Sequence, residues 1–134
     1  MSAENVSLVK QIYHAFGTGD VPAAIAAMGP EIEWNEAENF PYADGNPYIG
    51  AEAIVDGVFS RLASEWDGFH FAPEQFLDAG DTVIAIGRYG GTWRGTGKAM
   101  SPQAAHIWTC ADGKAVRFQQ MVDTLAVARA MGAA

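Results

Sequence analysis

The strongest constraint on the fold is a change in hydrophobic period near residue 66. Before this point, apolar residues recur at three- and four-residue spacing, which is typical of amphipathic helices. After it, strand-like patterns run over about 69–77, 81–93, 99–110 and 115–123. Helices followed by hairpin-linked strands predict an α+β domain with the helices on one face of an antiparallel sheet.

Short turns separate the predicted strands. Residues 79–81 and 95–97 contain glycine, and Asp112-Gly113 between two strand-like runs is a strong signal for a two-residue hairpin. Glycines cluster at 87, 90 and 91, where a bend or bulge is easiest. We therefore expect the sheet to curl around the helices.

Capping and breaking residues bound the remaining elements. Asp20 is a favourable N-cap, and Gly29-Pro30 is expected to end the helix that follows it. Two prolines and two glycines within 36–50 predict a long loop, and such loops are often functional lids or rims. The expected helices are 3–16, about 21–28, 51–65 and 124–131, with one early strand at 31–35.

Size and composition place the chain among single-domain globular proteins. Its 134 residues are 49% apolar and 18% charged, so we expect one domain over 1–134 with a substantial core. The net charge of -8 and the eight scattered Lys and Arg residues argue against nucleic-acid binding. No apolar run of about 20 residues or secretory signal is visible, which predicts a soluble, cytoplasmic protein without a membrane partner. The single Cys110 and the absence of Cys/His spacing predict no disulfide and no metal site.

Several short motifs follow one another along the chain in a recognisable order. They are Tyr13-His14-Ala15-Phe16 with Gly19-Asp20, Glu31-Ile32-Glu33-Trp34, Ile49-Gly50-Ala51-Glu52-Ala53, Asp78-Ala79-Gly80-Asp81-Thr82-Val83, His106-Ile107-Trp108, Asp112-Gly113-Lys114 and Asp123-Thr124. Together they resemble the nuclear transport factor 2-like superfamily, in its SnoaL-like, ketosteroid-isomerase-related branch. The resemblance implies a cone-shaped, cystatin-like α+β roll with a central pocket between the concave sheet and the helices. It also implies a homodimer built through the sheet.

The predicted Asp112-Gly113 hairpin allows the pocket face to be worked out. With these two residues at the turn, paired positions sum to 225, so His106 opposes Gln119. Alternation then places one set of side chains on a single face: Ala104, His106, Trp108, Gln119, Met121 and Asp123. This mixture of apolar walls and a few polar groups is typical of a ligand pocket. A register shift of one residue would overturn the pairing.

Asp123 is the strongest candidate for a catalytic group. It occupies the position where the resemblance to SnoaL-like cyclases implies an acid/base aspartate, and burial in an apolar cavity would raise its pKa toward the useful range. It also directly precedes the last predicted helix, where Asp is a favoured N-cap. Both interpretations stay open. His106 is a second catalytic candidate, with a hydrogen-bonded core histidine as its alternative.

Aromatic side chains provide the expected substrate-binding walls. Tyr13, Trp34, Trp66 and Trp108 are predicted to line the pocket with Gln119 and Met121, although simple core packing explains the aromatic residues as well.

The residues that steroid isomerases use are not matched. In the register set by Gly19-Asp20, the catalytic Tyr falls on Ile12, the general base near Trp34 and the second acid near Gln103. The acidic run Glu31, Glu33, Glu36 and Glu38 is interpreted as a solvated strand face and loop.

Two hypotheses about function follow from these features. The first is a cofactor-independent enzyme of isomerase, cyclase or lyase type acting on an apolar carbonyl compound. In it, Asp123 moves a proton at the carbon next to the carbonyl, and His106 or a Trp N–H stabilises the enolate oxygen. The second is a non-catalytic protein that binds a small apolar molecule in the same pocket.

Overall fold

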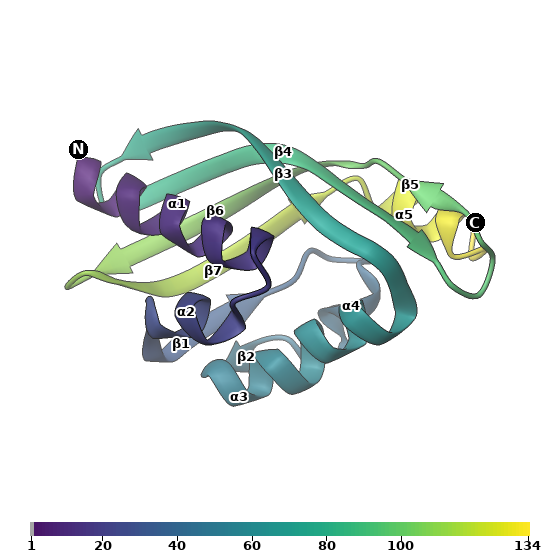
Figure 1. Ribbon diagram of the computed structural model, residues 1–134, viewed down its shortest axis with the longest axis horizontal. Helices are drawn as coiled ribbons and strands as arrows, with labels where there is room; N and C mark the ends of the chain where they lie inside the picture. Colours follow the sequence, from purple (N-terminus) through teal and green to yellow (C-terminus); the bar gives the residue numbers. More distant parts are fainter. Residues whose placement is uncertain (1) are drawn as a thin grey trace.

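A curved mixed sheet packs over the helices in the computed structural model, which describes residues 2–134 (Figure 1). The helical segments are α1 (Ala3–Gly17), α2 (Val21–Ala26), η1 (Pro41–Gly45), α3 (Ala51–Ile54), η2 (Val55–Phe59), α4 (Ser60–Glu65) and α5 (Thr124–Ala130). The strands are β1 (Met28–Asn35), β2 (Tyr48–Ile49), β3 (Trp66–Ala79), β4 (Thr82–Trp93), β5 (Ala99–Met100), β6 (Gln103–Ala111) and β7 (Lys114–Val122). The sheet order is β2-β1-β7-β6-β4-β3, with β5 paired to β4. The α+β prediction is confirmed.

The sheet is not purely antiparallel, which corrects the sequence-based prediction. β1 runs parallel to β7, with Trp34 opposite Phe118 and Asn35 opposite Gln119. Hairpin turns force antiparallel pairing only between consecutive strands. β1 is separated from β7 by helices and five strands, so turn signals gave no information about this pair.

The start of β1 also differs from the prediction. α2 ends at Ala26, and Met28 already pairs with Ala115 of β7, so β1 passes through Gly29-Pro30 instead of starting after it. The backbone N–H of Ala115 donates to the carbonyl of Ala27 at 2.9 Å, which fixes this corner of the chain to the sheet.

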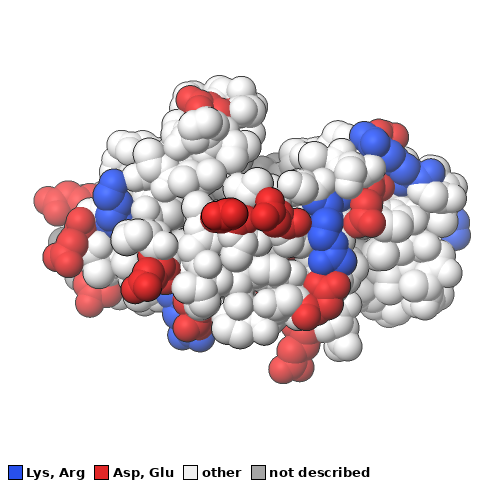
Figure 2. Space-filling view, turned by 90° about the horizontal axis from the view of Figure 1, so that it is seen from below, with Lys and Arg blue, Asp and Glu red and all other residues white. Residues whose placement is uncertain are grey.

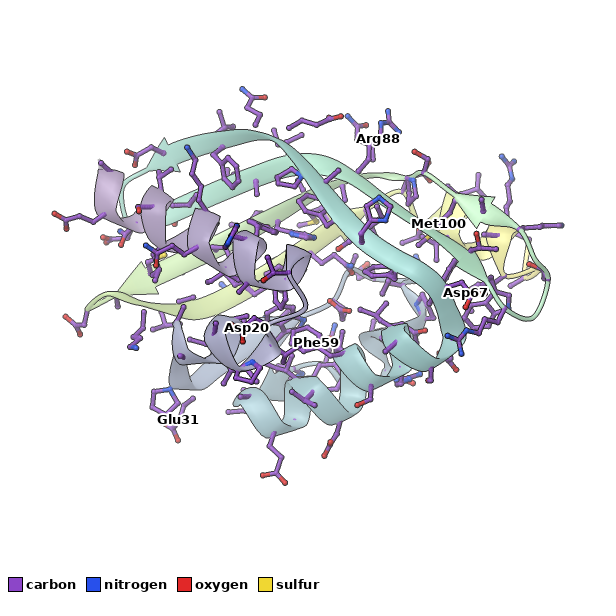
Figure 3. All side chains as sticks on the ribbon, viewed as in Figure 1. Asp20, Glu31, Phe59, Asp67, Arg88 and Met100 are labelled. Atoms are coloured by element: carbon purple, nitrogen blue, oxygen red, sulfur yellow. The ribbon has the colours of Figure 1, made fainter. Side chains whose placement is uncertain are left out.

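The predicted helix over 51–65 is one helical segment with a wider turn in its middle. α3 and α4 flank η2, which is a π-helical turn. Gly57 lies in this turn, and a Cβ there would sit 2.1 Å from the Tyr48 ring, so the position requires glycine. Val58 and Phe59 of the same turn line the cavity described below, and Figure 3 shows Phe59 in the space between this segment and the sheet. Turns of this kind are often found at functional sites.

The β6–β7 hairpin has the predicted turn but a different register. Asp112 and Gly113 both have positive φ, at 52° and 75°, as the two-residue turn requires. Two pairs follow the predicted register, and then Val116 is bulged, so that Thr109 faces Arg117. Beyond the bulge, His106 faces Gln120 and not Gln119. The predicted pocket face is therefore wrong on the β7 side.

The segment 36–50 is folded tightly onto the domain. The side chain of Asn46 accepts from the backbone N–H of Glu36 at 2.9 Å and donates to its carbonyl at 2.8 Å. The Tyr42 hydroxyl donates to Glu65, and Arg61 packs over the Tyr42 ring. These contacts hold the segment as a fixed wall at the end of β1.

None of the helices within residues 2–134 has the length and hydrophobicity needed to cross a membrane.

Candidate functional site

A cavity of about 510 Å³ lies between the helices and the concave face of the sheet. Its buried part, the floor, is lined by Tyr13, Trp34, Glu36, Val58, Trp66, Tyr89, His106, Trp108, Phe118 and Gln120. Its exposed lining residues, the mouth, are Gly17, Ala63, Gly68, His70 and Arg94. The structure thus places five of the sequence-predicted site residues on the floor of this cavity: Tyr13, Trp34, Trp66, His106 and Trp108.

Three proposed site residues lie outside this cavity. Gln119 and Met121 are on the outer face of β7, because the bulge at Val116 reverses the alternation beyond it. Asp123 is exposed and caps α5, where its carboxylate accepts from the backbone N–H of Ala126 at 3.2 Å. Of the two interpretations of Asp123, the structure shows the cap and does not show a carboxylate in the cavity.

A buried hydrogen-bond network joins two tyrosines through one histidine on the floor. The Tyr13 hydroxyl lies 2.6 Å from Nδ1 of His106, and the Tyr89 hydroxyl lies 2.5 Å from Nε2. The imidazole is stacked against Phe71 with ring centroids 4.2 Å apart. Burial lowers the pKa of His106 to about 3, so the ring is neutral at physiological pH.

Two further side chains orient the tyrosine hydroxyls. Trp108 Nε1–H donates to the Tyr13 hydroxyl at 2.8 Å, and the Gln120 amide donates to the Tyr89 hydroxyl at 2.8 Å. Gln120 is held in this orientation because its carbonyl oxygen accepts from the backbone N–H of Ala37 at 2.9 Å. Both hydroxyls therefore already accept one hydrogen bond.

Counting hydrogens shows what the network can offer a ligand. A neutral His106 carries one N–H, and burial raises the pKa of both Tyr13 and Tyr89, so both hydroxyls keep their hydrogens. These three hydrogens serve only two contacts with the imidazole. One hydroxyl hydrogen is left over in either tautomer, and both tyrosines line the cavity. The floor can therefore donate a hydrogen bond to an oxygen of a bound molecule.

Glu36 is a buried carboxyl group on the same floor. Its residue is only 3% exposed, and Oε2 accepts from Trp34 Nε1 at 3.2 Å. Within residues 2–134, Oε1 has no hydrogen-bond partner. Desolvation raises the pKa of Glu36 to about 7, although the Trp34 hydrogen bond opposes the shift. The Glu36 charge in turn helps to raise the pKa of Tyr89, so the two groups are near neighbours. A carboxyl group with this pKa can both remove and return a proton near neutral pH.

The sequence contained signals for the residues that were missed. Ile32 and Trp34 point inward from β1, and Glu36, the residue that directly follows the strand, continues their alternation onto the buried face despite its charge. Tyr89 likewise continues the inward series of Val83 and Ala85 on β4. Gln120 carried no such signal, because only the bulge at Val116 turns it inward.

On the helical face of residues 2–134, the charged side chains form no large cluster of one sign (Figure 2). Figure 2 shows basic side chains on the helical face in small separate groups, mostly beside acidic ones. Within residues 2–134, no three His, Cys, Asp or Glu side chains are arranged to hold a metal ion.

Comparisons with known proteins agree with this architecture. The family model of the SnoaL-like domain matches residues 9–118. A nuclear transport factor 2-like protein from Burkholderia thailandensis is 45% identical over 98% of both chains, with a TM-score of 0.91. TerC, co-crystallised with polyporic acid, is 26% identical over 97% of this chain and 99% of its own, with a TM-score of 0.87. A nuclear transport factor 2-like protein from Burkholderia xenovorans is 27% identical over 97% of both chains, with a TM-score of 0.81.

No curated protein matches the chain in sequence. The family model, however, covers far more than half of the chain, and the most similar of these structures is matched along nearly its whole length. The chain therefore belongs to the SnoaL-like domain family, within the nuclear transport factor 2-like superfamily.

Proposed function

We propose that this protein is a cofactor-independent enzyme that moves a proton at the carbon next to a carbonyl group in a small apolar compound. The observation that carries the proposal is the Glu36 carboxyl group, which is buried, has a pKa of about 7 and lies on the floor beside hydroxyl donors. Isomerisation next to a carbonyl, aldol-type cyclisation and β-elimination from a carbonyl compound can each begin with this proton transfer.

The chemistry needs one base and one donor. The Glu36 carboxylate takes the proton from carbon, and the C–H bonding electrons form the enolate double bond while the carbonyl oxygen becomes negative. The spare hydroxyl hydrogen of Tyr13 or Tyr89 stabilises that oxygen. The Glu36 carboxylic acid then returns its proton to another carbon. Alternatively, the enolate carbon attacks a second carbonyl group, and the alkoxide that forms takes the proton from Glu36.

The walls favour an apolar, ring-containing substrate. Trp34 stacks on Phe118 with centroids 3.8 Å apart, and Phe71 and Phe69 flank Tyr89. Such surfaces bind flat apolar rings and exclude water from the carboxyl group. The similarity to TerC, a protein co-crystallised with polyporic acid, is consistent with a small organic ligand.

The test is proton exchange at carbon, which needs no knowledge of the natural substrate. 2-Tetralone, an apolar aryl ketone, is incubated in deuterated buffer with the protein, and loss of its α-hydrogen signals is followed by NMR. We expect the protein to accelerate exchange over buffer. Binding of 2-naphthol, a stable mimic of the enol, without any accelerated exchange would contradict the enzyme and support the alternative of a non-catalytic binding protein.

Replacing Tyr89 with phenylalanine is expected to lower the exchange rate by about 10- to 100-fold, because the variant loses a hydroxyl that supports the enolate oxygen. Tyr42→Phe is the matched control, since it removes a buried hydroxyl that does not line the cavity. Equal rates for the two variants, measured by the same NMR assay, would show that the Tyr89 hydroxyl does not support the enolate oxygen.

We also propose that the protein forms a homodimer through the outer face of the sheet. Two rows of apolar side chains cross this face from strand to strand. Leu77, Ile84 and Ile107 form one row, and Ile86, Ala105 and Met121 form the other. Leu77 and Met121 are 38% and 50% exposed, which is unusual for large apolar side chains in a monomer.

Light scattering is expected to give twice the 14.3 kDa chain mass, and Ile86→Lys is expected to reduce it to one chain. Leu125→Lys on α5 is the control, because this side chain is exposed but outside the two rows. A single-chain mass for the unmodified protein, or a dimer that survives Ile86→Lys, would contradict the proposed interface.

A further inference from the structure

The mouth of the cavity differs from its floor in charge. Among the lining residues that the structure describes, Arg94 is the only Lys or Arg, and the floor holds only the carboxyl of Glu36 and neutral polar groups. A guanidinium beside a cavity is notable in a chain with a net charge of -8. It makes the mouth the one place on this cavity where an anionic group would be attracted.

Backbone and side-chain contacts hold Arg94 at this position. Its backbone N–H donates to the carbonyl of Glu65 at 3.1 Å, which ties the end of β4 to the end of α4. Its Nη2 donates to the carbonyl of Ala63 at 3.3 Å, and its Nε donates to Asp67 at 2.7 Å. Within residues 2–134, the remaining nitrogen, Nη1, has no partner.

The ion pair with Asp67 leaves Arg94 able to attract a second anionic group. The two side chains are 51% and 65% exposed, and pairs this exposed contribute little stability. Figure 3 shows Asp67 at the start of β3, on the edge of the molecule. A ligand carboxylate at the mouth can therefore bind Nη1 without breaking a strong interaction, and it competes only weakly with Asp67.

Aromatic side chains connect the mouth to the floor, because the half-buried Phe69 lies beside two floor residues, Trp66 and Tyr89. Trp66 lies beside Phe69 with ring centroids 6.4 Å apart, and Phe69 lies beside Tyr89 at 5.1 Å. The cavity thus presents a cation at the mouth, an aromatic middle and a proton-transfer site on the floor. These three zones would bind an anionic group, an apolar body and a carbonyl group of a single ligand.

We infer that the substrate is an amphipathic ketone with an anionic group, such as a carboxylate, at the end opposite to the reacting carbonyl. The guanidinium of Arg94 binds the anionic group at the mouth, the aromatic wall covers the apolar body, and the carbonyl reaches the floor. This inference rests on the proposed function for the direction in which the substrate lies.

Two probes that differ in one group test the inference. 6-Hydroxy-2-naphthoate has a hydroxyl for the floor and a carboxylate at the far end, and 2-naphthol lacks the carboxylate. Both are titrated by fluorescence at a pH at which the carboxylate is ionised and the naphthol hydroxyl is neutral. We expect the unmodified protein to bind the naphthoate about 10-fold more tightly than the naphthol.

Three variants identify the group responsible. Arg94→Gln is expected to remove the preference for the carboxylate and to leave 2-naphthol affinity within about twofold. Asp67→Asn is expected to strengthen the preference, because the competing carboxylate is gone. Arg88→Gln is the control, since it removes an equal charge on the outer side of the sheet, where Figure 3 shows Arg88 pointing away from the helices.

Equal affinity for both probes in the unmodified protein, or a preference that survives Arg94→Gln, would overturn the inference. A failure of the proposed function has a different signature. In that case the carboxylate preference would persist and depend on Arg94, while 2-tetralone exchange would stay at the buffer rate.

Discussion

Glu36→Gln is expected to lower α-proton exchange in 2-tetralone by about 10²- to 10⁴-fold, the usual contribution of a positioned general base. The amide has nearly the same shape, and its oxygen can still accept from Trp34 Nε1, so the cavity should persist. What is lost is the group that takes the proton. Exchange measured by NMR under equal protein and ketone concentrations gives the ratio directly.

Glu33→Gln is the matched control for this variant. Glu33 lies on β1, three residues before Glu36, and pairs with Arg117 on the surface, away from the cavity lining. The exchange rate of the unmodified protein should also rise with pH and level off above about 7, because only the carboxylate form of Glu36 accepts a proton. A Glu36→Gln variant with full activity, or a rate independent of pH between 5 and 8, would be incompatible with Glu36 as the base.

The free energy of unfolding is expected to be independent of pH between about 4.5 and 6.5. The reason is that two buried groups, Glu36 and His106, shift their pKa values in opposite directions on folding. The pKa of Glu36 rises from 4.5 to about 7 on folding, so in this range the folded state holds a proton that the unfolded state lacks. The pKa of His106 falls from 6.5 to about 3, so the unfolded state holds a proton that the folded state lacks. The two slopes cancel.

Single variants should separate the two slopes with opposite signs. In Glu36→Gln only His106 remains, so stability should fall by about 1.4 kcal/mol for each pH unit as the pH drops from 6.5. In His106→Gln only Glu36 remains, so stability should increase by about the same amount per unit as the pH drops from 7 to 4.5. At pH 8, Glu36→Gln should be about 3 kcal/mol more stable than the unmodified protein, because it no longer buries a charge.

Urea unfolding at half-unit pH steps measures these slopes. Glu33→Gln again serves as the control, since the Glu33 carboxylate pairs with Arg117 on the surface and its removal should leave the flat region in place. Parallel curves for the unmodified protein and Glu36→Gln would mean that Glu36 keeps an ordinary pKa in the folded state, and its role as a base near pH 7 would lose its physical support.

Local patterns in the sequence predicted most of the elements. The apolar spacing of α1, the helical segment over 51–65 and the Asp112-Gly113 turn are properties of neighbouring residues, and the structure contains all three. The parallel pairing of β1 with β7 depends on tertiary packing, so it could not be predicted from turn residues. Family resemblance supplied the curved cone and its cavity, which local pattern alone could only suggest.

The sequence predicted aromatic residues that line the candidate site, but it did not predict the buried carboxyl group of Glu36 or the side chains of Tyr89 and Gln120. Asp123 was predicted mainly because the resemblance to SnoaL-like cyclases implies an acid/base aspartate at this position, yet one bulged residue, Val116, changes which side chains of β7 face inward. Sequence alternation assumes one residue for every position of the partner strand, and a bulge breaks this assumption without leaving a mark in the composition. Glu36 was not predicted as a site residue, because its charge indicated a solvated position although the alternation of Ile32 and Trp34 indicated a buried one. Its burial depends on side chains from distant strands.

The pairing of β1 with β7 has a consequence for the way the chain is synthesised. The Gln120 amide that binds the backbone of Ala37 lies 83 residues further along the chain. During translation, β1 leaves the ribosome, together with α1 and α2, long before β7 has been synthesised. The apolar face of β1 is therefore exposed to solvent during this time. Closing so long a loop makes this contact a late event in folding. The proposed proton-transfer site is therefore assembled only when the last strand docks, and a chain that stalls before β7 lacks the Gln120 side of this site.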